Sequence, residues 1–112
     1  MTADDFRRMA LALDGAEEAA HMGHPDFRVG GRVFATLGHP DGAWAMVQLP
    51  PEQQAVFVET APDAFRPATG AWGARGSTSV RLDGADREML ERALRAAWLH
   101  VRAKAAPRRR RA

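Results

Sequence analysis

The chain contains no cysteine among its 112 residues. This absence excludes disulfide bonds, thiolate zinc sites, iron–sulfur clusters and cysteine nucleophiles. No apolar stretch approaches the roughly 18 residues from which a membrane-spanning helix is built. The first residues, Met1-Thr2-Ala3-Asp4-Asp5, are acidic where a signal peptide would be basic. We therefore expect a cytoplasmic protein that does not enter a membrane.

The sequence motifs of several common enzyme classes are also missing. There is no Walker A loop and no helix-opening Gly-x-Gly-x-x-Gly pattern, and no Gly-x-Ser-x-Gly turn surrounds Ser77, Thr78 and Ser79. The glycine-rich stretch 70–76 precedes an expected strand, which favours a turn over a phosphate-binding loop. Because no set of nucleophile, base and orienting carboxylate can be named, we expect a non-enzymatic protein with no cofactor and no identifiable small-molecule substrate.

Three histidines, His21, His24 and His39, occur near Asp26 in the sequence. A His-x-x-His pair on an extended strand does not bring both rings to one face, whereas a spacing of four residues on a helix does. The spacing therefore favours ordinary strand and turn histidines, and we predict no metal site.

Positive charge is concentrated at the C-terminal end of the chain. Arg108, Arg109, Arg110 and Arg111 are four of the sixteen basic residues, and without them twelve basic residues face fourteen acidic ones. The body thus has a formal charge near −2, and the basicity belongs to a tail that we expect to be disordered over residues 105–112. Two interpretations of this tail remain open: a solvating segment, or an auxiliary set of phosphate contacts without sequence preference.

Three helices are predicted from capping residues and apolar spacing. Thr2 and Asp5 fit a capping box before a helix over residues 3–13, and Pro50-Pro51-Glu52 opens a short helix that ends near residue 59. The last helix has Asp83 as its expected N-cap, with Glu88–Arg92 and Glu91–Arg95 spaced for ion pairs. Its apolar stripe consists of Leu90, Ala93, Leu94, Ala97, Trp98 and Val101.

Short strands separated by turn residues fill most of the remaining chain. Candidate strands cover residues 17–22 (the weakest), 26–29, 32–37, 43–49 and 78–82. Gly30-Gly31 and Asp41-Gly42 both suit two-residue turns. Segment 63–76, which carries Pro67 and several glycines, is expected to be an irregular connection.

This order of elements predicts one α+β domain over residues 1–104, built as a two-layer structure with helices packed on one face of an antiparallel sheet. If both turns have two residues, the helix-covered face carries Phe27, Val29, Phe34, Val47 and Leu49. The second face then carries Arg28, Val33, Ala35, Leu37, Trp44 and Met46, and Arg81 joins it by alternation. That face is either open or covered by segment 63–76.

The stretch from His24 to Leu37, preceded by Gly15-Ala16-Glu17-Glu18, resembles the signature of the MmcQ/YjbR family. The similarity continues through Leu49, Pro51-Glu52-Gln53, segment 72–82, Ala85-Asp86, Leu90 and Ala97-Trp98, and it covers about residues 3–102. The resemblance implies a compact two-layer fold like that of CyaY (frataxin-like) and secretion-chaperone-like domains. It also implies DNA binding, for which a double-wing arrangement is proposed in the family. Ser77 departs from the family pattern, which usually has an aromatic residue there.

Two functions follow as hypotheses. DNA binding, implied by the resemblance, would use Arg28, Arg32, Arg75 and Arg81, together with Arg108, Arg109, Arg110 and Arg111 of the tail. Alternatively, the protein is an interaction or homodimerisation module that uses Trp44 and Met46 on the open sheet face.

Arg28 is the arginine of greatest interest, because strand alternation sends its side chain away from Phe27 and Val29 on a tight hairpin. Its side chain could form a cross-strand or surface ion pair. It could instead anchor a phosphate or carboxylate, because the guanidinium fork suits bidentate contact with oxyanions.

Overall fold

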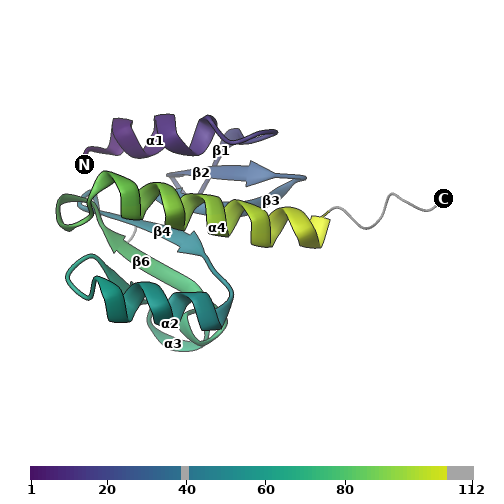
Figure 1. Cartoon of the computed structure of the whole chain (residues 1–112). Helices are drawn as coiled ribbons and strands as arrows, with labels where there is room; N and C mark the ends of the chain where they lie inside the picture. The colour runs from purple at the N-terminus through teal and green to yellow at the C-terminus, as the bar shows by residue number, and fades with distance from the viewer. Residues whose placement is uncertain (39–40, 106–112) are drawn as a thin grey trace.

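The computed structural model describes residues 1–38 and 41–105 (Figure 1). In chain order the elements are α1 (Ala3–Leu11), β1 (Glu17–His21), β2 (His24–Val29), β3 (Arg32–Leu37), β4 (Trp44–Gln48), α2 (Pro51–Thr60), β5 (Phe65–Pro67), α3 (Gly70–Ala74), β6 (Ser77–Arg81), the 3-10 turn η1 (Leu82–Gly84) and α4 (Arg87–Ala105). The predicted α+β class is confirmed. None of the described helices is long and apolar enough to cross a membrane.

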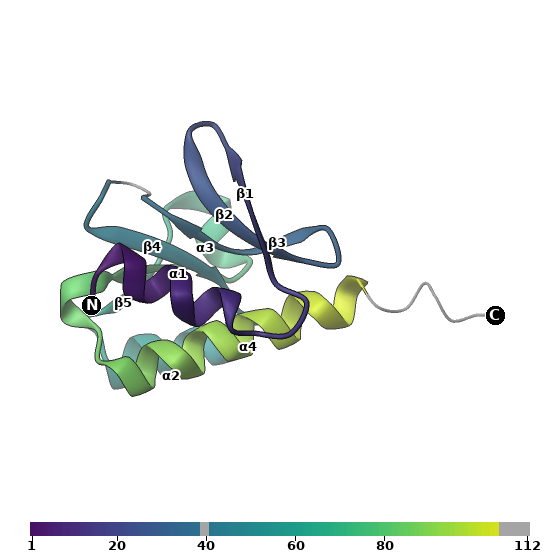
Figure 2. The same ribbon diagram turned by 90° about the horizontal axis from the view of Figure 1, so that it is seen from above.

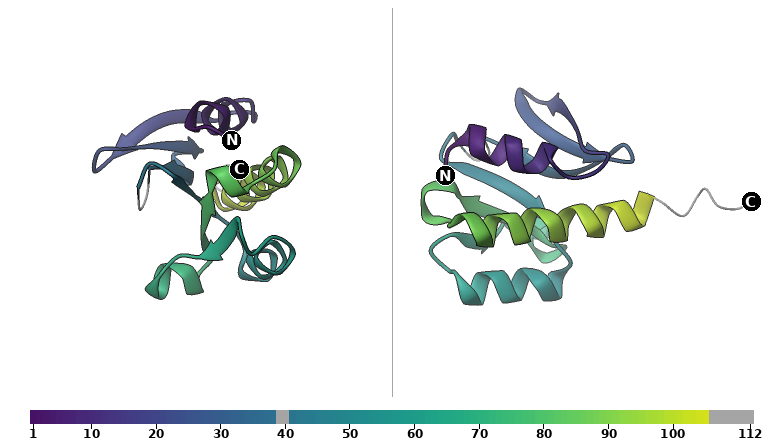
Figure 3. Two further views of the ribbon diagram at one scale, coloured as in Figure 1. Left: turned by 90° about the vertical axis from the view of Figure 1, so that its left-hand side faces the viewer. Right: turned by 45° about the horizontal axis from the view of Figure 1, so that its top comes forward.

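The six strands of the described residues join in one antiparallel sheet with the order β1-β2-β3-β4-β6-β5. Figures 2 and 3 show α1, α4 and α2 along one side of this sheet, as predicted. The short helix α3 lies on the other side, and the β1–β2 hairpin extends past the sheet toward that same side (Figure 3, left). The second face of the sheet is therefore flanked by α3 and by the β1–β2 hairpin.

The core lies between the sheet and the three larger helices. The rings of Phe6 and Phe27 have centroids 6.0 Å apart, and those of Phe57 and Phe65 are 5.1 Å apart. On α4 the buried residues are Leu90, Ala93, Leu94, Ala97, Trp98 and Val101, which is the predicted stripe. The indole Nε1 of Trp98 also donates a 2.8 Å hydrogen bond to the Asp14 carbonyl, which joins α4 to the turn after α1.

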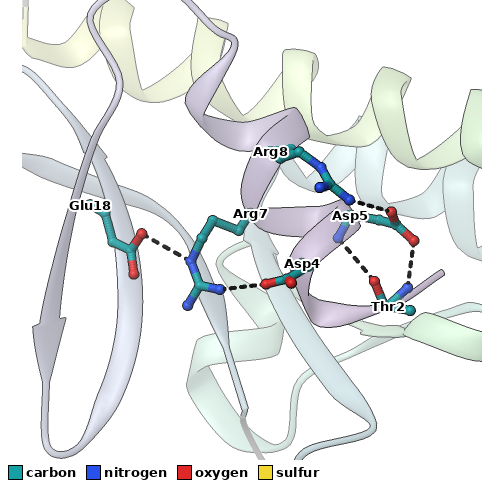
Figure 4. Close-up of polar contacts among 6 residues, drawn as sticks. All are labelled: Thr2, Asp4, Asp5, Arg7, Arg8 and Glu18. Atoms are coloured by element: carbon teal, nitrogen blue, oxygen red, sulfur yellow. Dashed lines mark hydrogen bonds and ion pairs between the residues drawn. The ribbon is translucent and has the colours of Figure 1, made fainter.

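The start of α1 forms the predicted capping box (Figure 4). The Thr2 hydroxyl accepts from the Asp5 backbone N–H at 3.1 Å, and an Asp5 carboxylate oxygen accepts from the Thr2 N–H at 2.9 Å. One turn later, Arg7 contacts both Asp4 and Glu18 at 3.0 Å. The contact with Glu18 links α1 to the edge strand β1.

The register of β3 differs from the one predicted. The Gly30-Gly31 turn is present, with φ of 61° and 80°, but a bulge follows, so that Phe27 pairs with Ala35 instead of Phe34. The connection between β3 and β4 is longer than two residues, because Gly38 N–H bonds to the Trp44 carbonyl.

These two irregularities move Ala35 and Leu37 to the helix-covered face, where they pair with Val47 and Ala45 and are buried. Assigning Ala35 and Leu37 to the second face was wrong. Thr36 takes their place on that face, directly opposite Met46.

Segment 63–76 is more ordered than predicted, since it contains β5 and α3. The N-cap of α4 is also different: the Asp86 carboxylate accepts from the Met89 N–H at 2.8 Å, whereas Asp83 lies in η1 and pairs with Arg81 at 2.9 Å. Glu88 and Arg92 form the predicted ion pair at 2.9 Å, but Glu91 pairs with Arg87 instead of Arg95. The helix extends to Ala105, one residue into the predicted tail, and Arg108–Arg111 lie outside the described residues.

Candidate functional site

A groove of about 630 Å³ lies on the second face of the sheet, lined by residues of the β1–β2 hairpin and of α3. Its floor is formed by side chains from β3 and β4, namely Val33, Thr36, Met46 and Gln48. One wall comes from the hairpin and includes His21 and Arg28. The opposite wall comes from the segment that begins at Ala68 and includes Trp72. This volume is in the usual range for a small-ligand site, about 300–1,000 Å³.

The wall formed by α3 depends on close backbone packing at Gly73. A Cβ atom built on Gly73 would lie 1.8 Å from the Ala68 carbonyl oxygen, so that only glycine permits this approach. The buried Gln54 of α2 donates from Nε2 to the Gly73 and Ser77 carbonyls, each at 3.0 Å. A side chain from the helix layer thus fixes both ends of the turn that leads from α3 into β6.

The hairpin wall is organised around Asp26, whose side chain is fully buried. Its carboxylate oxygens accept from Arg28 Nε at 2.8 Å and Nη2 at 3.0 Å, and Oδ2 lies 2.6 Å from His21 Nδ1. The hydrogen bond from Arg28 is the largest cause that lowers the pKa of Asp26, and His21 adds to it, against an opposing effect of burial. Asp26 is therefore an ionised carboxylate beneath two side chains that reach the groove.

The tautomer of His21 follows from this contact. An ionised carboxylate only accepts hydrogen bonds, so Nδ1 of His21 carries the proton that is shared with Asp26. The other ring nitrogen, Nε2, is then a hydrogen-bond acceptor in the neutral ring and a donor in the protonated ring. The His21 side chain is 46% exposed and lines the groove.

An exposed aromatic ring forms the opposite wall. Trp72 is 66% exposed, and the Arg75 guanidinium lies 5.7 Å from its ring centroid. Elsewhere on this face, the guanidinium of Arg66 stacks 4.2 Å from the ring centroid of Trp44. Within the described part of the chain, neither Arg66 nor Arg75 forms an ion pair with a carboxylate.

The structure separates the site residues expected from the sequence. Arg28 and Met46 line the groove, and Arg75 lies at its Trp72 wall. Trp44 and Arg81 pair across β4 and β6 and line a different hollow together with Arg66. Arg32 follows the β2–β3 turn and alternates with Val33, so it does not face the groove.

Three contributors to the groove were not among the expected site residues, namely Asp26, His21 and Trp72. The hairpin turn consists of Met22 and Gly23, with φ of 51° and 81°, and it places His21 directly opposite His24. The two histidines therefore share a face, contrary to the expectation from an uninterrupted strand. Among residues 1–38 and 41–105 no group of three potential ligands lies close enough to hold a metal ion, and His39 falls outside them.

These features define a class of protein: a two-layer α+β domain whose antiparallel sheet is covered by helices on one face and grooved on the other. The chain belongs to the YjbR family, whose model matches residues 11–100.

Among solved structures, the chain is similar to protein DR2400 of Deinococcus radiodurans, described as a DUF419 domain. The TM-score is 0.80 at 23% identity, and the alignment covers 96% of this chain and 83% of that one. This likeness shows the fold alone. No match was found among the curated proteins.

Proposed function

We propose that this chain is a non-enzymatic nucleic-acid-binding domain that binds a single-stranded segment of DNA in the groove. The observation that carries the proposal is the exposed ring of Trp72 with Arg75 beside it, on one wall of a groove whose other wall presents Arg28. Aromatic rings and arginine side chains are the groups on which unpaired bases stack and to which their phosphates bind.

Charge favours a single strand over a duplex. The described residues carry twelve basic and fourteen acidic side chains, since the other four arginines all lie in the tail. Binding to a duplex without sequence preference depends on many phosphate contacts from a basic surface. A concave, aromatic-lined groove with a few arginines can instead bind unpaired bases by stacking, which contributes about 1–3 kcal/mol per base.

The experiment is a fluorescence-anisotropy titration of labelled single-stranded and duplex DNA with the full chain and with a variant that lacks residues 108–112. If Arg28 and Arg75 each contact a phosphate, a plot of the logarithm of the binding constant of the shortened variant against the logarithm of the salt concentration has a slope of about −1.4. Its affinity then falls about sevenfold between 50 and 200 mM salt. Arg75→Gln weakens binding, whereas Arg81→Gln, on the same sheet face but outside the groove, leaves it unchanged.

Two results would contradict the proposal. One is the absence of binding to either DNA at 50 mM salt. The other is the loss of all binding when residues 108–112 are deleted, because the polyanion would then be attracted by the tail and not by the folded domain.

Homodimerisation through the second sheet face is the other candidate. Trp44 and Met46 do lie on this face, although Trp44 is stacked under Arg66 and Met46 forms part of the groove floor. A dimer of this kind would dissociate in the variant Trp44→Glu with its far-ultraviolet circular dichroism unchanged. A light-scattering mass equal to that of one chain at high concentration, in both proteins, would remove this candidate.

A further inference from the structure

We propose that His21 and Arg28 form a phosphate subsite and that the groove binds one nucleotide, with its phosphate on these two side chains and its base against Trp72. This inference rests on the proposed function. It specifies which side chains of the same groove contact the phosphate of a nucleotide and which contact its base. Asp26 is assigned the role of a positioning residue, which acts through Arg28 and His21.

Asp26 orients the guanidinium of Arg28. Asp26 accepts from Nε and from Nη2, and so uses two of the five N–H donors of the guanidinium. Three donors remain on a side chain that is 35% exposed and lines the groove. Because the carboxylate fixes the plane of the guanidinium, the remaining donors are already oriented before an oxyanion binds.

His21 supplies the second side chain of the phosphate subsite. Its Nδ1 is occupied by Asp26, so Nε2 is the ring nitrogen left for a ligand. In the neutral ring this atom accepts from a singly protonated phosphate monoester, and in the protonated ring it donates to a phosphate oxygen. Arg28 and His21 contact the same carboxylate from neighbouring strands, and this places them side by side on the hairpin wall.

The space between the two walls suits a base and a sugar. The groove floor has a thioether and an aliphatic side chain from Met46 and Val33, which suit a flat heterocycle. It also has the amide of Gln48, whose Oε1 accepts from the Ser77 hydroxyl at 3.0 Å and whose NH₂ group is a potential donor. A phosphate anchor at one wall and an aromatic ring at the other match the two ends of a nucleotide.

A nucleotide can come from two sources: a free mononucleotide, or one residue of a single strand. The inference is tested by titrating the full chain, labelled with ¹⁵N, with deoxyadenosine monophosphate, deoxyadenosine and inorganic phosphate in turn. The monophosphate should shift the Trp72 indole N–H and the Arg28 Nε–H signals. The indole of Trp98, which donates to Asp14 in the interior, is an internal control that should not move.

Variants separate the contacts with the phosphate from the contact with the base. Arg28→Lys keeps the charge and loses the fork, and the double variant Asp26→Asn/Arg28→Gln removes both charges without leaving an unpaired buried carboxylate. Each should weaken monophosphate binding about 10- to 100-fold, as expected for charge-assisted hydrogen bonds, and should leave deoxyadenosine binding unchanged. Trp72→Ala should weaken the binding of both, whereas Arg81→Gln should affect neither.

The outcomes distinguish this inference from the proposed function. If single-stranded DNA binds but monophosphate neither binds nor competes, and Arg28→Lys has no effect on the DNA, the subsite is wrong and the proposed function stands. If monophosphate binds as described and DNA does not, the subsite is correct and the groove belongs to free nucleotides. Equal binding of monophosphate and deoxyadenosine would also overturn the subsite.

Discussion

Oδ2 of Asp26 and Nδ1 of His21 lie 2.6 Å apart across the β1–β2 hairpin, and the same carboxylate accepts two hydrogen bonds from Arg28. The carboxylate is fully buried, whereas its two partners reach the groove. A short strand pair at the edge of the sheet therefore contains an internal ionic cluster, with consequences for both stability and binding.

The ionised Asp26 carboxylate should make the stability of the chain sensitive to acid. The pKa of Asp26 is lower in the folded chain than its ordinary value, chiefly because of the hydrogen bond from Arg28. The stabilisation is thus fully present above the unfolded value of about 3.9 and is lost as the pH falls through the lower, folded value. The difference in unfolding free energy between the wild type and Asp26→Asn, measured by urea denaturation, should narrow as the pH falls below about 4. A difference that widens in acid would contradict this assignment.

Arg28→Ala should lower the melting temperature, because it leaves the buried Asp26 carboxylate with His21 as its remaining partner. The double variant Asp26→Asn/Arg28→Ala should recover part of that loss, since no charge then remains unpaired in the interior. The measurement is a double-mutant cycle by thermal denaturation. Additive effects of the two substitutions would show that the pair is not coupled.

Gly73→Ala should destabilise the chain by about 1–3 kcal/mol, the usual cost of forcing an extra group into a packed site. The added Cβ would lie 1.8 Å from the Ala68 carbonyl oxygen, so that α3 must move. Gly42→Ala is the matched control, because a Cβ there meets nothing within 4 Å. Urea denaturation should show a change within about 0.5 kcal/mol for this control. If the two variants were equally stable, close packing against Ala68 would not be the reason for a glycine at position 73.

Leu94→Ala should cost about 2–5 kcal/mol in unfolding free energy, as is typical of deleting a fully buried leucine. Leu99, on the same helix, is 49% exposed, and Leu99→Ala should change stability by about 0.5 kcal/mol or less. Denaturant titration of the two variants tests the orientation of α4 on the sheet. A larger loss of unfolding free energy in Leu99→Ala than in Leu94→Ala would contradict that orientation.

Much of the fold could be predicted from the sequence where a local signal determines the structure. The stripe on α4 and the Thr2–Asp5 capping box were predicted because helical spacing and capping are local properties of the chain. The Gly30-Gly31 turn was predicted for the same reason, since both residues need positive φ.

The register of β3 could not be predicted in the same way. Phe34 is an extra residue opposite the junction of Phe27 and Arg28, and a bulge of this kind reverses the alternation that follows it. All four residues from Phe34 to Leu37 are buried, on whichever face of the sheet they lie. The apolar pattern therefore does not indicate which of them face the helices.

The groove was only partly predictable. Alternation placed Arg28 on the correct face. The contact of His21 with Asp26, however, depends on a turn at Met22-Gly23, where Met22 adopts a φ of 51° that non-glycine residues rarely take. The position of Trp72 depends on α3, whose five residues carry no helical periodicity long enough to detect.

Two tryptophans on the same sheet face show whether the groove is the nucleic-acid-binding surface. The affinity of a short single-stranded DNA is measured for the chain lacking residues 108–112, with Trp72→Ala or Trp44→Ala introduced. Trp72→Ala should weaken binding about 5- to 150-fold, the loss of one stacked base, and Trp44→Ala, outside the groove, should leave the affinity unchanged. Equal affinities for Trp72→Ala and the parent, or a larger loss with Trp44→Ala, would contradict this prediction.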